Sequence, residues 1–110
     1  MINIFIVILI NINNEIFKKI QLFNYCKSLT SLNLSNFNTR NVTNMGNMFD
    51  SCSGLTSLDL SKWDISEGTI ITNMFRECNA LRTIRMKGCS EATINKVTSV
   101  KPSSADIITQ

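Results

Sequence analysis

The residues of this chain with the most reactive side chains are four cysteines, and three of them recur at one interval. Cys26, Cys52 and Cys78 are each separated by 26 positions. Zinc sites use closely spaced Cys or His pairs, but the chain has no histidine and no Cys-x-x-Cys motif. A disulfide needs Cβ atoms about 3.5–4.5 Å apart, closer than equivalent side chains on neighbouring strands. The interval therefore predicts a column of buried free thiols, and we expect Cys89, which lies off that column, to be the most reactive.

Catalysis by a serine or cysteine nucleophile normally needs a histidine base, which this sequence does not contain. The acidic side chains Asp59, Asp64, Glu67 and Glu77 all fall within one short stretch and have the pattern of solvated turn and surface residues. The sequence also has no glycine-rich phosphate loop and no metal-binding carboxylate spacing. We therefore expect a protein that is not an enzyme and that holds no cofactor or metal.

The interval of the cysteines belongs to a longer repeat. Residues 27–52 and 53–78 share Leu-Thr-Ser-Leu-x-Leu-Ser at the front and Asn-Met-Phe-x-x-Cys at the back. A fixed period of this length predicts stacked coils, each of which buries its apolar face against its neighbours. We interpret residues 1–110 as a single domain in which 1–26 is a degenerate first coil and 79–110 is a closing strand-helix-strand unit. The apolar content of 44% supports a packed interior.

Each coil is expected to hold one short strand and one short helix. Leu32 and Leu34 alternate with polar residues as in a strand, and equal steps along the chain make such strands parallel. The same pattern predicts strands at 57–61 and 83–86, a closing strand at 106–109, and a first strand at Ile6 and Ile8. The buried aromatic residues Phe37 and Trp63 occupy one slot in successive coils, where we expect them to fill a corner.

The helices are predicted from apolar residues three or four positions apart. One helix is expected at Val42, Met45, Met48 and Phe49, capped by Asn41 or Thr43, with Thr69 as the equivalent cap in the next coil. Two further helices are expected, one capped by Asn14 with Ile16, Ile20 and Phe23 facing inward, and one capped by Ser90 with Ile94, Val97 and Val100 facing inward.

The charge pattern is weakly informative. The net charge is +3, and the basic residues of the last third are Arg82, Arg85, Lys87, Lys96 and Lys101. They fit either an acidic partner or a solvated face, and they lack the interleaved aromatic residues typical of nucleic-acid binding.

The apolar stretch 1–10 is too short to span a bilayer and has neither the basic start nor the cleavage site of an export signal.

The strings Leu-Thr-Ser-Leu-Asp-Leu-Ser-Lys-Trp-Asp at 55–64 and Val-Thr-Asn-Met-x-x-Met-Phe-x-x-Cys at 42–52 closely resemble the BspA-type leucine-rich repeat surface proteins of bacteria. Together with the period, the resemblance predicts an α/β fold: a leucine-rich-repeat-like right-handed solenoid with one short parallel strand plus one short helix per 26-residue coil. It also implies a cell-surface or secreted binding module that adheres to a protein or glycan on a host cell, the matrix or a neighbouring cell. The poor first coil and the missing export signal depart from the pattern.

The outward side chains of the predicted sheet are the candidate binding residues. Solenoids recognise large partners through such extended surfaces. Asn33, Asp59 and Arg85 would occupy one exposed position on successive strands, which changes the row from neutral to negative to positive. The alternatives are that these residues only keep the face soluble, or that the chain is a structural or C-terminal fragment of a longer repeat array with no ligand of its own. The complete candidate face is Ser31, Asn33, Ser35, Ser57, Asp59, Ser61, Thr83, Arg85 and Lys87.

Overall fold

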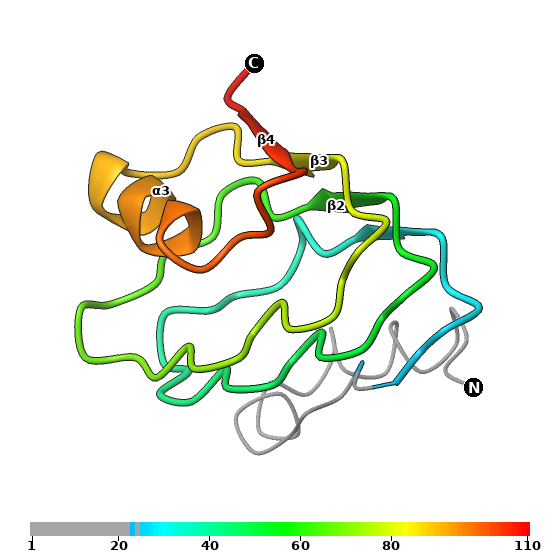
Figure 1. Cartoon of the computed structure of the whole chain (residues 1–110). Coiled ribbons are helices and arrows are strands. Elements are labelled where there is room, and N and C mark those ends of the chain that lie inside the picture. The colour runs from blue at the N-terminus through cyan, green and yellow to red at the C-terminus, as the bar shows by residue number, and fades with distance from the viewer. Residues whose placement is uncertain (1–22, 24) are drawn as a thin grey trace.

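The computed structural model describes Phe23 and residues 25–110, and it has one parallel sheet of short strands (Figure 1). Neighbouring strands follow one another in sequence, and α3 (Glu91–Thr98) is the helix of the described part, between the third and fourth strands. The strands predicted at 57–61, 83–86 and 106–109 and the one at Leu32 are confirmed, although each is only three residues long. The strands are β1 (Ser31–Asn33), β2 (Ser57–Asp59), β3 (Thr83–Arg85) and β4 (Asp106–Ile108).

The strand register follows the sequence repeat. Ser31 lies opposite Ser57, and Ser57 opposite Thr83, so the first three strands pair at an interval of 26 residues. The last step is shorter by three residues, because Thr83 lies opposite Asp106. Equivalent residues of the first three repeats therefore lie directly beside one another in the sheet.

The side chains that point inward from the sheet form continuous buried columns. Leu32, Leu58 and Ile84 are paired in register and buried, and partly buried Ile107 continues their column on β4. A second column follows each strand end, with Leu34, Leu60 and Met86 all at 0% exposure. Removing this apolar surface from water is the main stabilising term for so small a sheet.

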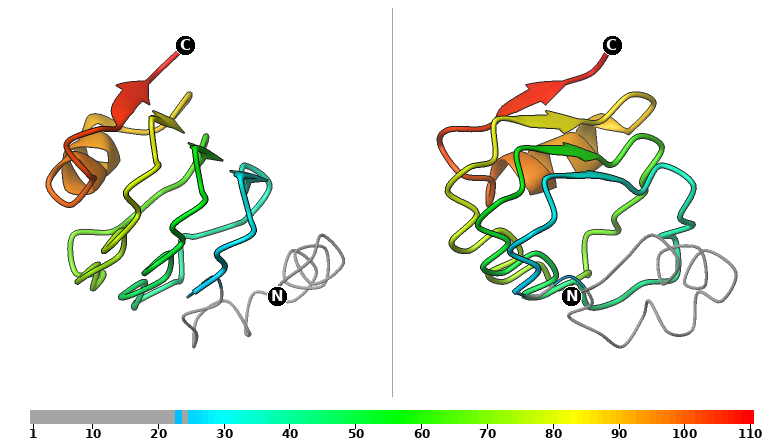
Figure 2. Two further views of the ribbon diagram at one scale, coloured as in Figure 1. Left: turned by 45° about the vertical axis from the view of Figure 1, so that its right-hand side comes forward. Right: turned by 90° about the vertical axis from the view of Figure 1, so that its right-hand side faces the viewer.

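The side opposite the sheet is formed by residues 44–52 and 70–78, which we call the back layer; these segments lie side by side in both views of Figure 2. Phe49 is at its centre. Its ring stacks on Phe23 of the preceding repeat and on Phe75 of the following one, with centroids 5.6 Å apart in both cases. The three rings are 26 residues apart and form one aromatic column.

The predicted helices at Val42–Phe49 and after Thr69 are wrong. Both segments are chains of tight turns with one isolated bridge, Asn44 to Ile70, and no helical residue. Val42, Met45, Met48 and Phe49 do face the core, as predicted. Asn41, Thr43 and Thr69 consequently cap nothing; the Thr69 hydroxyl instead donates to the Val42 carbonyl across the repeat boundary at 3.0 Å.

The hydrogen bonds explain why the back layer is not helical. Alternate amides close local turns, as Met48 N donates to Met45 O and Asp50 N to Asn47 O. The amides between them donate to the next repeat instead, as Phe49 N does to Met74 O at 2.9 Å. Left-handed φ angles recur at Asn47 and Asn73 and at Ser51 and Glu77, and such residues interrupt a right-handed helix. The turns still bury Val42, Met45, Met48 and Phe49, so apolar residues at this spacing face the core without a helix.

The helix predicted after Ser90 is confirmed. Ser90 is the N-cap of α3 and its hydroxyl accepts from Thr93 N at 3.2 Å. Val97 is buried, and Ile94 and Val100 pack against the core. The strand predicted at Ile6 and Ile8 and the helix predicted after Asn14 lie outside the described residues, except that Phe23 is buried as expected.

Candidate functional site

The outward face of the sheet brings most of the predicted binding residues together. A shallow hollow of about 260 Å³ lies over it and is lined by residues of all four strands. Ser31, Asn33, Ser57, Asp59, Thr83 and Arg85 line the hollow and lie in two rows across the strands. The prediction that they share one face is therefore confirmed.

The exposure of the predicted residues is uneven. Ser31, Asn33, Arg85 and Lys87 are exposed, and Ser35, Ser57, Asp59 and Thr83 are half-buried. Ser61 is only 6% exposed, so its place among the outward residues is wrong. It follows the strand rather than belonging to it, and its hydroxyl accepts a hydrogen bond from Lys87 N at 3.1 Å. Ser61 therefore joins two repeats and is not available to a partner.

Asn33 and Asp59 also have a structural role at the strand ends. Ser35 N donates to Asn33 Oδ1, and Ser61 N donates to Asp59 Oδ1, both at 2.9 Å. Each side chain thus satisfies the amide two residues later, the arrangement of an Asx turn. One oxygen of each is committed to the fold, which leaves the rest of the amide or carboxylate group for contact with a partner.

Arg85 cannot accept such a bond and extends across the sheet instead. Its guanidinium donates to the carbonyl of Gln110, beyond β4. The third strand therefore carries a cation on the face where the second carries the carboxylate of Asp59. This row of Asn33, Asp59 and Arg85 is the chemically most varied feature of the face.

Two residues of the face were missed by sequence reasoning. Asp106 and Ile108 continue the two outward rows on β4, opposite Thr83 and Arg85. The interval from β3 to β4 is shorter than the repeat, so a fixed step of 26 residues does not reach them. Asp106-Ile107-Ile108 does not alternate between polar and apolar residues, so the sequence carried no signal for its register, and only the pairing with Ile84 identifies Ile107 as the inward residue.

The cysteine column lies in the core, away from this face. Cys26, Cys52 and Cys78 are buried free thiols, as predicted. Cys52 Sγ donates to Phe23 O at 2.7 Å, and Cys78 Sγ donates to Phe49 O at 2.9 Å. Burial raises the pKa of Cys52 to about 12 and that of Cys78 to about 11. Both remain neutral near pH 7 and serve as packing groups with a hydrogen-bond donor.

Cys89 occupies the corner slot of Phe37 and Trp63. Trp63 Nε1 donates to Leu34 O at 2.8 Å, and Cys89 Sγ donates to Leu60 O, one repeat later, at 3.4 Å. The side chain at this slot thus donates to the end of the preceding strand in both repeats. Cys89 is half-buried and burial raises its pKa, so its greater reactivity remains a prediction.

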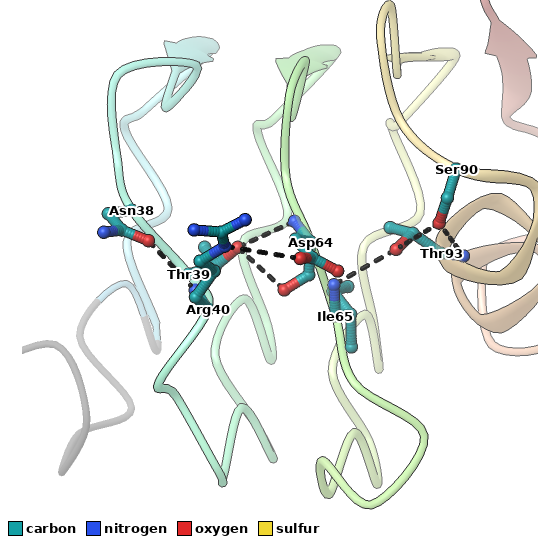
Figure 3. Close-up of polar contacts among 7 residues, drawn as sticks. All are labelled: Asn38, Thr39, Arg40, Asp64, Ile65, Ser90 and Thr93. Carbon is teal, nitrogen blue, oxygen red and sulfur yellow. Dashed lines mark hydrogen bonds and ion pairs between the residues drawn. The ribbon is translucent and has the colours of Figure 1, made fainter.

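A lateral groove of about 570 Å³ lies between this corner and the start of α3. Figure 3 shows its polar contacts: the Thr39 hydroxyl accepts from Asp64 N at 2.9 Å and donates to Asp64 O at 3.2 Å. One repeat further along, Ile65 N donates to Thr93 Oγ1 at 3.1 Å. Threonine hydroxyls therefore join the repeats on this side, and we assign the groove a structural role.

Comparisons with known proteins give a family but no function. A family model described as "Mycoplasma protein of unknown function, DUF285" matches residues 11–103. No curated protein and no solved structure matches the chain. Among the helices of the described residues, none is long and apolar enough to cross a membrane.

Proposed function

Since the chain belongs to the DUF285 family of Mycoplasma proteins, whose function is unknown, we propose that it is a non-enzymatic binding module. It binds a protein or glycan partner through the outward face of its parallel sheet. The fold that carries this function is a right-handed solenoid of the leucine-rich-repeat type.

The solenoid assignment is supported by the equivalence of successive repeats. The first three strands pair at the interval of the sequence repeat. On the opposite side, the three stacked rings have the same interval. The resemblance of residues 42–64 to BspA-type repeats agrees with both observations. We accordingly place the protein at the cell surface or outside the cell, where proteins of that type act as adhesins.

The observation that carries the proposed binding role is the hollow over the sheet. Its rim holds an amide, a carboxylate and a guanidinium on adjacent strands, at Asn33, Asp59 and Arg85. No described helix or loop crosses this face in Figure 2. A face of this kind offers directional polar contacts to a large partner, whereas the apolar side chains of the same strands are buried.

Adhesion of coated beads tests the proposal. Beads carrying the whole chain are applied to a monolayer of cultured host cells, and the bound beads are counted under flow. The double variant Asp59→Asn, Arg85→Gln removes both charges, while asparagine keeps the acceptor for Ser61 N. We expect at least a tenfold loss of bound beads, because both charged groups of the face are removed.

The matched control is Glu67→Gln, which changes a charge on an exposed residue away from the sheet. Its beads are expected to bind as the parent does. Protease or periodate treatment of the monolayer then distinguishes a protein from a glycan partner. Equal binding by the parent and the double variant, with both folded by circular dichroism, refutes a role for this face.

The second candidate function is a structural piece of a longer repeat array. It is favoured by the back layer, whose pattern already holds at the start of the described residues, where Phe23 N donates to Met48 O. Further repeats in the neighbouring coding sequence would support it. A purified chain that is a stable monomer without such repeats would contradict it.

A further inference from the structure

The segments of the back layer are joined by a regular pattern of backbone hydrogen bonds. The amides of Met45, Asn47, Phe49 and Ser51 each donate to a carbonyl of the next repeat, at 2.7–3.0 Å. Their acceptors are the carbonyls of Ile70, Thr72, Met74 and Arg76, again at alternate residues. Each segment of the layer thus offers a row of four amides to whatever lies beyond it.

The same row recurs one repeat later without a partner. Its amides belong to Ile71, Asn73, Phe75 and Glu77, and none of them donates to an acceptor within the described part of the chain. Phe75 is only 3% exposed as a residue, and its amide donates to no described acceptor. Amides without a hydrogen-bond acceptor are rare in native proteins, because burial without a hydrogen bond is unfavourable.

A groove follows this row. It has a volume of about 630 Å³, within the usual range of ligand pockets, and it runs between residues 73–79 and the loop 100–104 that precedes β4. The last back-layer segment is at the end of the stack in Figure 2, with α3 covering only the part nearer the sheet. The row of amides therefore has room for an external chain.

The groove is lined by several hydrogen-bond donors, so a ligand that fits it must present hydrogen-bond acceptors. Besides the amides, its walls offer the Arg76 guanidinium and the side-chain donors of Asn79 and Ser103. Its acidic side chain, Glu77, already accepts from Asn79 Nδ2 at 3.5 Å. Alternate carbonyls are what an extended peptide presents along one edge, as in strand addition to a sheet. The positive charge of exposed Arg76 favours acidic side chains on that peptide.

We propose that this groove binds an extended acidic peptide segment of a partner protein, whose backbone carbonyls accept from the amides of Asn73, Phe75 and Glu77. The site is separate from the outward face of the sheet and does not depend on the function proposed for that face. It continues the interface by which the repeats of this chain bind one another.

The test uses the whole chain labelled with ¹⁵N and the peptide acetyl-Ala-Glu-Ala-Glu-Ala-Glu-amide as the probe. We expect the largest amide shift changes at Asn73, Phe75 and Glu77. Arg76→Gln should weaken binding about fivefold, because one charge-assisted contact of about 1 kcal/mol is lost. The matched control Arg40→Gln, at the lateral groove, and the parent with the lysine analogue of the peptide measure non-specific attraction.

Unchanged affinity for Arg40→Gln and no binding of the lysine peptide complete the supporting result. The proposal is overturned if the acidic peptide causes no shift changes, or if they centre on the outward residues of the sheet. Equal weakening by Arg76→Gln and Arg40→Gln would also overturn it, since that result means attraction to basic residues in general. Adhesion through Arg85 can succeed or fail independently of each of these outcomes.

Discussion

The sheet side and the back layer use one sequence interval to build two different backbones. On the sheet side, strands pair in register and expose every second side chain. In the back layer, some amides close tight turns, and those of Met45, Asn47, Phe49 and Ser51 between them donate to the next repeat. On both sides, equivalent apolar residues of successive repeats stack into buried columns. A repeat therefore fixes which residues stack, but it leaves the local backbone to the residues between them.

Because their backbones differ, the sheet side and the back layer are stabilised by different interactions. The strands are three residues long, so backbone pairing alone holds little of the sheet. The back layer instead has a continuous aromatic stack and recurrent left-handed residues, such as Asn47 and Asn73. We expect the back layer to be the more sensitive to loss of a side chain and the sheet side to be the more tolerant at its surface.

Replacing the central ring of the stack should have the largest effect. Phe49 is fully buried between two rings, so Phe49→Ala removes two stacking contacts and leaves a cavity. We expect the free energy of unfolding to fall by about 3–5 kcal/mol in urea titration. Leu58→Ala, the matched change on the sheet side, should cost about 2–3 kcal/mol. A larger loss for Leu58→Ala would reverse the comparison.

The cysteine column predicts a loss of stability in alkali. Burial raises the pKa of Cys52 to about 12 and of Cys78 to about 11, from an ordinary value of 9.0. Since the folded-state pKa is raised, the stabilisation is complete below pH 9 and is lost as pH rises from 9 towards 11–12. We expect the free energy of unfolding to decrease by about 2–4 kcal/mol between pH 8 and pH 10.5.

The double variant Cys52→Ala, Cys78→Ala is the control for this titration. It lacks the two buried thiols and keeps every other side chain of the protein. Its unfolding free energy should depend much less on pH over that range, whatever its starting stability. An equally steep decline in the variant would show that other groups cause the alkaline loss.

Gly54 and Gly68 lie in different surroundings: Gly54 is in contact with the preceding repeat, and Gly68 is in an open turn. A Cβ on Gly54 would lie 2.4 Å from the carbonyl oxygen of Lys27, in the preceding repeat, whereas a Cβ on Gly68 would meet nothing within 4 Å. Gly54→Ala should therefore cost about 1–3 kcal/mol through forced separation of the repeats. Gly68→Ala should be neutral within about 0.5 kcal/mol. Thermal unfolding of both variants distinguishes a role in packing from a general preference for glycine.

The interior of the molecule could be predicted from the sequence because burial follows the repeat. The leucine columns, the three buried thiols, the Ser90 cap and the closing strand all follow from spacing and residue type. The same interval relates Phe23, Phe49 and Phe75, although their stacking was not predicted. Side-chain columns were predictable because each repeat presents the same apolar positions to the same neighbours.

The backbone of the back layer was not predictable in this way. Apolar residues three or four apart fit a helix and a series of tight turns equally well, and Asn, Ser and Thr favour both helix caps and turns. The outward position predicted for Ser61 was wrong for a related reason. The polar and apolar residues still alternate there, but the strand ends at Asp59 and Ser61 is buried. Asp106 and Ile108 were missed because the last interval is three residues short.

The smallest predicted effect lies at the surface of the sheet and separates the two roles of Asp59. Its Oδ1 accepts from Ser61 N at 2.9 Å, and Asn33 Oδ1 makes the equivalent bond to Ser35 N in the preceding repeat. Because an asparagine already serves at that position, Asp59→Asn should leave the free energy of unfolding unchanged within about 0.5 kcal/mol. Asp59→Ala removes the acceptor and should cost about 1 kcal/mol, measured by urea unfolding. Equal losses for the two variants would mean that the negative charge, rather than the turn, stabilises the strand end, and asparagine could not then serve as a neutral replacement in the adhesion test.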